Sequence, residues 1–185
     1  DPLFINPIDN VNFYISSNAE KAFRLLIHSA DFTTPSWFRG GVIYHIFVDR
    51  FYRSGKVTEK RKKALYAPEW QSDITQYGAY PGAHVQNNEF FGGDLWGIIE
   101  KLPYLSELGV TVLYLSPVFE AYSNHKYDTG DYQTVDSGFG GRKALDTLIE
   151  KAAEYDMRIL LDGVFNHTGD DSLYFDRYGN YGGAG

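Results

Sequence analysis

Apolar runs alternate with amphipathic segments along most of this chain, and the alternation limits the folds that it can adopt. Three runs rich in Val, Ile, Leu and aromatic residues predict strands, at 42–48, 110–117 and 157–161. Two segments between them, 94–108 and 143–154, carry apolar residues at helical spacing. Strands that alternate with helices form parallel sheets through right-handed crossovers. The sequence therefore predicts an α/β fold, either the first half of a (β/α)8 TIM barrel or a doubly wound open sheet.

Local signals mark the ends of these elements. Asp94 is a good N-cap, because its carboxylate can accept hydrogen bonds from the first free amides of a helix. Pro103 lies inside the helical pattern and should kink or divide it, and Gly109 should end it. The run at 42–48 is almost continuously apolar, which predicts a central strand buried on both faces.

The connections that follow the first two strands are long, whereas those that follow the helices are short. One of the long connections runs from Val118 to Arg142 and is rich in polar and aromatic residues. Such a connection is usually functional or contains small elements of its own. In a barrel, the loops after the strands build the active face. No G-x-G-x-x-G or Walker A motif follows any strand, which argues against a nucleotide-binding open sheet.

The first 35 residues differ in pattern from the remainder of the chain. Strand-like runs at 11–15 and 22–28 flank a polar turn and predict a hairpin. Because an isolated hairpin is marginal in water, we interpret residues 1–35 as the end of an upstream β-rich domain and its linker. Residues 36–185 are then the α/β part of the chain, and in a (β/α)8 fold they would be the N-terminal part of the barrel, truncated after the third strand.

Composition narrows the partners of the protein. The formal net charge of −7 argues against nucleic acid or an anionic membrane, and no apolar run is long enough to span a bilayer. The absence of cysteine excludes disulfides and cysteine-based zinc sites, and fits a reducing compartment such as the cytoplasm. Aromatic residues make up 17% of the chain, and their flat faces suit sugar rings as well as a protein core.

Polar side chains follow the third predicted strand. The run at 157–161 stops at Asp162, and Asn166 and His167 come shortly after it. Ligands bind at the carboxyl ends of strands in parallel sheets and barrels, so these three residues are candidates for function. The alternative is a turn whose Asp and Asn only satisfy backbone groups.

Four segments together resemble the alpha-amylase family of glycoside hydrolases, and most of all its neopullulanase, maltogenic amylase and cyclomaltodextrinase branch. They are GVIYHIFVDRF at 41–51, FGGDL at 91–95, HKYDT at 125–129 and DGVFNH at 162–167. The first is similar to that family's first barrel strand, and the last to its Asp-x-x-x-Asn-His signature. The likeness covers roughly residues 32–180.

The resemblance implies an enzyme that hydrolyses α-glucosidic bonds in starch, maltodextrin, pullulan or cyclodextrin with retention. Retention needs two carboxyl groups about 5–5.5 Å apart. In the family these follow the fourth and fifth strands, with a third acid after the seventh, so all three are expected beyond Gly185. The 185-residue segment alone should therefore be inactive. The upstream domain of this branch binds starch or mediates dimers, so a homodimer is also implied.

The same likeness gives individual roles to residues within the chain. Tyr127 should stack beneath the sugar at the cleaved bond, and His167 should hydrogen-bond one of its hydroxyls. Asp128 is expected to be a salt-bridge partner that orders this subsite. Asp162 is expected to orient groups at the barrel mouth and not to attack the substrate. The alternatives are loop packing for Tyr127, a surface position for His167 and a backbone-satisfied buried carboxylate for Asp162.

Calcium is the one cofactor that the resemblance suggests. Asn166 matches a position that often gives its side-chain oxygen to calcium, an ion that takes six to eight oxygen ligands. Asp49 and Asp94 could form a second calcium site, as in some members. The Asn-rich loop that those members use is replaced here by YRSGK at 52–56, which argues against this second site.

Two other functions stay open at this point. The first is a catalytically inactive relative that binds glucans or serves as an interaction module. The second is an unrelated barrel metal hydrolase that uses Asp162 and His167 as ligands, although no closely spaced His pair supports it. Three parallel strands cannot close a barrel, so an open sheet, a swapped strand or a partner chain is also expected.

Overall fold

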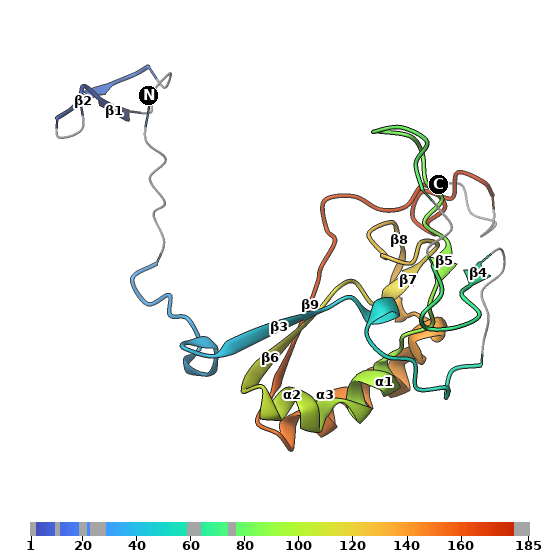
Figure 1. The fold of residues 1–185 in the computed structure, drawn as a ribbon. Coiled ribbons are helices and arrows are strands. Elements are labelled where there is room, and N and C mark those ends of the chain that lie inside the picture. Colours follow the sequence, from blue (N-terminus) through green and yellow to red (C-terminus); the bar gives the residue numbers. More distant parts are fainter. Residues whose placement is uncertain are drawn as a thin grey trace. The chain divides into compact units, whose positions relative to one another are not determined.

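The structure is a computed structural model that describes residues 3–9, 12–18, 22, 29–58, 64–73 and 77–179. The chain divides into two compact units, Asp1–Ser36 and Trp37–Gly185, which are described here one at a time (Figure 1). Among the described residues, no helix has the length and apolar character that crossing a membrane requires.

The first unit contains a short antiparallel hairpin. Strand β1 (Phe4–Pro7) pairs with strand β2 (Phe13–Ser16). The Asp9 carboxylate accepts hydrogen bonds from the backbone N–H and the side-chain amide of Asn12, each 2.8 Å long, and so stabilises the turn. This pairing adds a strand upstream of the predicted hairpin, and the predicted pairing of 11–15 with the next run stays a prediction. Residues 23–28 of that next run lie outside the described residues.

The second unit is built on a parallel sheet. Strands β3 (Val42–Ile46), β6 (Val110–Leu115) and β9 (Arg158–Leu161) lie in the order β3-β6-β9, and all their pairings are parallel. All three predicted strands are confirmed, each somewhat shorter than its apolar run. Within the described residues, the sheet is open at β3 and at β9 (Figure 1).

The helices begin and end where the sequence predicted. Helix α1 (Leu95–Glu100) is capped by Asp94, which accepts a hydrogen bond from Gly97 N at 2.7 Å. Pro103 lies in the first turn of helix α2 (Leu102–Glu107) and divides it from α1. Gly109 follows with φ +75, a left-handed conformation that glycine adopts without strain. The third helix, α3 (Gly141–Ala153), leads into β9.

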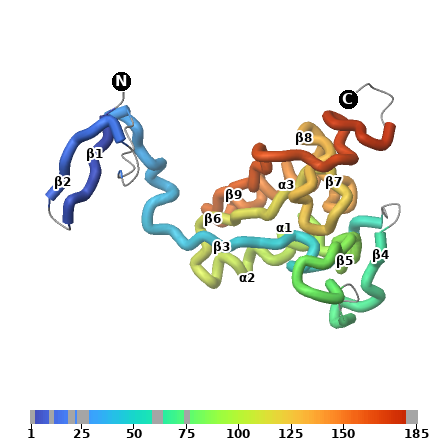
Figure 2. The backbone as a smooth tube through the Cα atoms, turned by 90° about the horizontal axis from the view of Figure 1, so that it is seen from above, coloured from blue at the N-terminus to red at the C-terminus, as the bar shows by residue number. Residues whose placement is uncertain are grey.

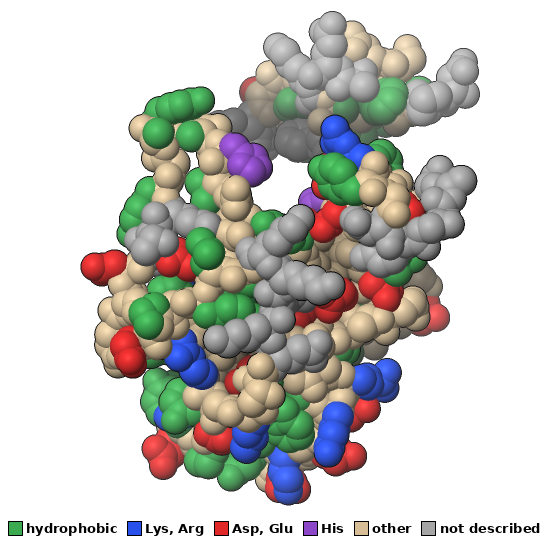
Figure 3. All heavy atoms as spheres, turned by 90° about the vertical axis from the view of Figure 1, so that its right-hand side faces the viewer, with side chains coloured by type: hydrophobic (Ala, Val, Ile, Leu, Met, Phe, Trp, Pro, Cys, Tyr) green, Lys and Arg blue, Asp and Glu red, His purple; other side chains and the backbone are tan. Residues whose placement is uncertain are grey.

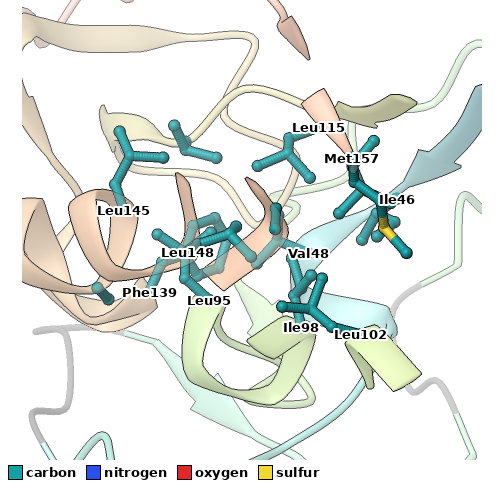
Figure 4. Packing of buried hydrophobic residues seen from close by; sticks show 14 of the residues in the cluster. Ile46, Val48, Leu95, Ile98, Leu102, Leu115, Phe139, Leu145, Leu148 and Met157 are labelled. Atoms are coloured by element: carbon teal, nitrogen blue, oxygen red, sulfur yellow. The ribbon is translucent and has the colours of Figure 1, made fainter. Parts of the chain in front are cut away.

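The hydrophobic core lies between the sheet and the three helices, which cover the same face of it (Figures 1 and 2). Figure 4 shows its side chains, among them Ile46, Val48, Leu95, Ile98, Leu115, Leu148 and Met157. Helix α3 contributes a narrower stripe than predicted, because Ile149 is 47% exposed. In Figure 3, most of the visible Lys and Arg side chains lie over the helices, interspersed with acidic ones, as expected for solvated helix faces.

Strand β3 is less buried than its sequence suggested. Val42 and Ile43 are 49% and 47% exposed, and only Ile46 is buried within the strand. The expectation of burial on both faces was wrong because β3 lies at the edge of the described sheet and the helices cover one face of it. The central strand is β6, where Val112 and Leu113 are both fully buried.

The long connections contain small elements of their own. After β3 come the one-turn helix η2 (Val48–Arg50) and the parallel pair β4 (Leu65–Tyr66) and β5 (Glu89–Phe90). After β6 come the antiparallel pair β7 (Phe119–Ala121) and β8 (Thr129–Val135) and the one-turn helix η3 (Ser137–Phe139). A further short helix, η1 (Ser36–Phe38), precedes β3.

At Gly97, helix α1 packs closely against the segment after β3. A Cβ at this position would lie 2.1 Å from the backbone oxygen of Tyr52. Helix propensity favours alanine by about 1 kcal/mol, but relieving a contact with backbone costs about 1–3 kcal/mol or more. We expect Gly97→Ala to lower the free energy of unfolding of the full-length protein in urea. Ser106→Ala, at an exposed position of α2, is the control, and a stabilising Gly97→Ala would contradict the packing.

Candidate functional site

Two tyrosine hydroxyls meet one carboxylate oxygen at the end of the sheet. Asp162 directly follows β9, Tyr114 lies on β6, and Tyr127 lies on the loop between β7 and β8. Both tyrosine hydroxyls donate hydrogen bonds to Asp162 Oδ2, and each bond is 2.7 Å long. Asp162 thus fixes a loop aromatic residue against the end of the central strand.

The local fold explains why Tyr114 points to this site. Successive residues of a strand face opposite sides of a sheet. Leu113 and Leu115 enter the core under the helices, so Tyr114 faces the other side. There its ring stacks on the ring of His45 from β3, with 4.7 Å between centroids and 23° between planes. His45 Nε2 lies 2.9 Å from Ser116 Oγ, which holds the imidazole in place.

The Asp162 carboxylate changes the acidity of both phenols. It accepts their protons in hydrogen bonds, and this is the main reason why the pKa of Tyr127 rises to about 12. Burial and the negative charge of Asp162 add to that rise. The same hydrogen bond raises the pKa of Tyr114. Both hydroxyls therefore remain protonated donors throughout the physiological pH range.

The raised pKa of Tyr127 gives a prediction for alkaline titration. In the full-length protein, its phenol should ionise near pH 12, above the value of about 10 for a free tyrosine. Since the folded pKa exceeds the unfolded one, this hydrogen bond stabilises the fold fully below pH 10 and loses its effect as the pH rises towards 12. Phenolate absorbance of the protein minus that of Tyr127→Phe isolates the group. Asp162→Asn should lower its pKa, and ionisation of Tyr127 near pH 10 in the unaltered protein would contradict the hydrogen bond.

His167 is held on both sides of its ring. Its Nε2 lies 3.0 Å from the carbonyl oxygen of Tyr127, and its Nδ1 lies 3.1 Å from the side-chain nitrogen of Asn166. This pattern fits a neutral ring with the proton on Nε2. The Tyr132 hydroxyl donates to the carbonyl oxygens of His167 and Val164 and so holds the loop after β9. A sugar hydroxyl would therefore have to replace one of the two present partners of His167.

Ser123 organises the loop that carries Tyr127. Its hydroxyl hydrogen-bonds the Asp128 carboxylate, and its backbone N–H donates to Asp128 Oδ2 at 3.0 Å. The same hydroxyl lies 3.0 Å from His125 Nδ1, an atom that also accepts a hydrogen bond from Tyr127 N. The pKa of His125 is lowered, mainly because burial disfavours the charged ring. No ion pair of Asp128 occurs among the described residues, so its predicted salt bridge remains a prediction.

A cavity of about 720 Å³ lies against this loop. Its walls include His125 and Asp128, together with Tyr122, His84, Asp170 and Tyr178. The lining is polar and aromatic, a mixture that suits a hydroxylated ligand. Asp170 accepts hydrogen bonds from Arg177 and from the hydroxyl of Tyr178, which fixes the wall contributed by the segment after β9.

The two carboxylates proposed for a second calcium site are already used by the fold. Asp49 is fully buried and accepts hydrogen bonds from Phe91 N and Gly92 N and from Arg50 Nε. Asp94 caps α1, and it also accepts from the N–H and hydroxyl of Ser54. Burial is the main reason why the pKa of Asp94 is raised. Both carboxylates are thus already hydrogen-bonded within the fold, and the suggested Asp49–Asp94 calcium site remains an expectation.

Asn166 offers one amide oxygen at an exposed position, while its side-chain nitrogen contacts His167. Among the residues that the structure describes, no group of three or more acidic, His or Cys side chains is placed to hold a metal. One oxygen is compatible with calcium but falls far short of the six to eight that the ion takes. The metal-hydrolase hypothesis, with Asp162 and His167 as ligands, has no support from the geometry either, because each is bound to tyrosine groups.

The structure thus brings together Asp162, Tyr127 and His167. Asp128 lies on the same loop as Tyr127, where it is hydrogen-bonded to Ser123. Tyr114 and His45 were not predicted, because both lie inside apolar runs where they are indistinguishable from core residues. His125 stood in a recognised motif but received no role of its own. Its position two residues before Tyr127 was the available signal.

The chain is similar in sequence to known proteins. A sequence model described as the alpha amylase catalytic domain matches residues 45–182. The chain is 42% identical over 174 residues to an amylopullulanase of Thermoanaerobacter thermohydrosulfuricus, and the match covers 87% of this chain and 12% of that protein. It is 45% identical over 147 residues to an intracellular maltogenic amylase of Bacillus subtilis, and the match covers 79% of this chain and 23% of that protein.

Among solved structures, the cyclic alpha-maltosyl-(1→6)-maltose hydrolase of Arthrobacter globiformis, in complex with cyclic alpha-maltosyl-(1→6)-maltose, matches with a TM-score of 0.65. It is 34% identical, and the match covers 78% of this chain and 29% of that one. Fold and site together define the opening part of a (β/α)8 barrel, with β3, β6 and β9 as its first three strands. The chain belongs to the alpha-amylase family. It spans 12% and 23% of the length of the two curated relatives described above.

Proposed function

We propose that the full-length protein hydrolyses α-glucosidic bonds in α-glucans such as starch, maltodextrin, pullulan or cyclodextrin, by a retaining double displacement. This segment supplies one wall of the subsite next to the cleaved bond. The observation that carries the proposal is the convergence of Tyr114 and Tyr127 on Asp162, at the end of the sheet, in a member of the alpha-amylase family. The relatives named amylopullulanase and maltogenic amylase support the substrate class.

The geometry supports the role proposed for each residue. Tyr127 is 39% exposed, and its hydroxyl is held by Asp162, so the ring is available to stack on the apolar face of a sugar. The Nε2 atom of His167 lies 3.0 Å from the Tyr127 carbonyl oxygen, where a sugar hydroxyl can compete for it. Asp162 acts through the two tyrosines and is not the nucleophile. The nucleophile and the general acid are expected after later strands of the barrel.

The test is hydrolysis by the full-length protein. Pullulan, maltodextrin and cyclodextrin are incubated with it separately, and the anomer released first is followed by proton NMR. An α-anomer as the first product supports retention at an α-linkage, and a β-anomer contradicts it. Binding of these glucans without any hydrolysis would favour the alternative of an inactive glucan-binding module. Absence of both binding and hydrolysis would overturn the proposal.

Two further expectations belong to this proposal. Asn166 would give one side-chain oxygen to a calcium ion whose other ligands come from outside the described residues, and calcium would stiffen the loop after β9. Residues 1–35 would be the end of an N-terminal β-rich domain that contributes to starch binding or to dimer formation. The β1–β2 hairpin supports a β-rich character for that segment.

A further inference from the structure

Lys126 is a lysine with its charge inside the protein. The side chain is 1% exposed, and its Nζ lies 2.6 Å from Oδ2 of Asp136, which is 0% exposed. Nζ also donates a hydrogen bond to the carbonyl oxygen of Ala121 at 3.3 Å. The rings of Phe90 and Phe139 lie nearby, with centroids 5.2 and 4.9 Å from Nζ. An ammonium group so enclosed depends on its partner carboxylate and on these aromatic faces.

The backbone at Lys126 is adapted to this inward direction. Its φ is +65, a left-handed conformation that residues with a Cβ seldom adopt. Its N–H donates to Ser123 Oγ at 3.0 Å, the same hydroxyl that contacts His125 and Asp128. Lys126 therefore points into the core, while Tyr127 beside it is exposed and reaches Asp162.

Asp136 connects this loop to the helix layer. Its Oδ1 accepts a hydrogen bond from Gly138 N at 2.8 Å and caps η3. Its backbone N–H donates to Val118 O, and its carbonyl oxygen accepts from Gly141 N at the start of α3. The far end of the Lys126 side chain is thus attached to a carboxylate that the backbone of the next loop and of one short helix keeps in place.

We propose that Lys126 is a positioning residue, whose buried pair with Asp136 holds the loop 122–128 so that Tyr127 meets Asp162 in the geometry that sugar binding needs. The inference rests on the proposed function, and it adds to it a residue that no sugar touches. Replacement of a buried ion pair by apolar residues is often neutral or stabilising. The contribution of this pair is therefore the direction of the loop, and it can be separated from stability by experiment.

The test compares three variants of the full-length protein. Lys126→Met leaves Asp136 buried without its ammonium partner and should lower the unfolding temperature. Lys126→Met/Asp136→Leu removes both charges and should regain most of that loss. Asp136→Glu keeps the ion pair but displaces the carboxylate by one methylene group. This variant replaces the other two if they fold poorly. In every folded variant, kcat/KM for maltodextrin should fall by about tenfold or more, because small displacements at a site are costly.

A second readout does not depend on turnover. With 3-fluorotyrosine at position 127, the fluorine resonance reports the ionisation of that phenol. In the unaltered protein, the pKa of this phenol should be higher than that of free 3-fluorotyrosine. In the variants, this pKa should move towards that of free 3-fluorotyrosine. Arg142→Met, which removes an exposed ion pair with Asp146, is the matched control and should change neither readout.

The outcomes separate the two proposals. A double variant with a restored unfolding temperature, unchanged kcat/KM and an unchanged fluorine titration would overturn the role of Lys126. If the unaltered protein neither binds nor cleaves glucans, the proposed function fails, and the fluorine titration alone decides whether Lys126 positions Tyr127.

Discussion

Replacing Asp162 with alanine in the full-length protein should lower kcat/KM for maltodextrin by about 10²–10⁴-fold, because each of the two hydrogen bonds to its charged oxygen contributes about 1.5–3 kcal/mol. Both bonds are 2.7 Å long, and they fix the rings of Tyr114 and Tyr127. The lower end of the range is the safer expectation, since Tyr127 is partly exposed. Steady-state kinetics of the purified variant measure the effect.

The control for this change keeps the shape of the side chain. Asp162→Asn retains one acceptor oxygen but not the charge, so its loss should be smaller than that of the alanine variant. Asp156→Asn alters an exposed aspartate in the turn before β9 and should leave kcat/KM unchanged. In a double-mutant cycle, Tyr127→Phe should cost much less once Asp162 has been replaced. Additive losses, or a near-normal alanine variant, would contradict the arrangement.

Replacing Asp49 with alanine should cost the second unit about 3–5 kcal/mol of unfolding free energy, because it leaves buried amides without acceptors. Asp49 is 0% exposed and accepts from Phe91 N, Gly92 N and Arg50 Nε. Urea unfolding of the full-length protein, followed by circular dichroism, measures the loss. Such a cost is a large part of the stability of an ordinary domain.

Asp49→Asn should lower the free energy of unfolding by less than Asp49→Ala does, since its one remaining oxygen can still accept hydrogen bonds from some of the donors. Asp146→Asn, on the exposed surface of α3, should change the free energy of unfolding by less than about 0.5 kcal/mol. A loss for Asp49→Ala as small as that of the Asp146 variant would show that water or other groups replace the carboxylate.

Much of the second unit could be predicted because its signals are local. The capping carboxylate of Asp94, the proline at 103 and the glycine at 109 act within one or two helical turns, and the structure places the ends of α1 and α2 accordingly. The pairing of the N-terminal hairpin was not predictable in the same way. Strand β1 is short and carries no extended apolar run, and its pairing with β2 is accompanied by hydrogen bonds of Asp9 with Asn12 that the apolar pattern does not indicate.

The site shows the same division. Tyr127, His167 and Asp162 stood in recognisable motifs, and in the structure Tyr127 hydrogen-bonds both Asp162 and His167. Tyr114 could not be identified, since a tyrosine within an apolar strand looks like a core residue until the direction of each side chain is known. Lys126 was hidden for the opposite reason, because a lysine in a polar loop is ordinarily solvated, and only tertiary packing shows that this one is enclosed.

The hydrogen bonds of Asp49 and Asp94 also close the two ends of the segment between β3 and α1. Asp49 binds Phe91 N, Arg53 Nε binds Phe91 O at 2.7 Å, and Ser54 binds Asp94, so the chain leaves and re-enters the barrel at nearly the same place. For a segment with such a fixed base, doubling its length adds only about 0.6 kcal/mol of closure entropy. Lengthening the stretch from Gly55 to Asn88 should therefore cost little closure entropy, provided that contacts such as the hydrogen bond from Asn124 N to Asn87 O are kept.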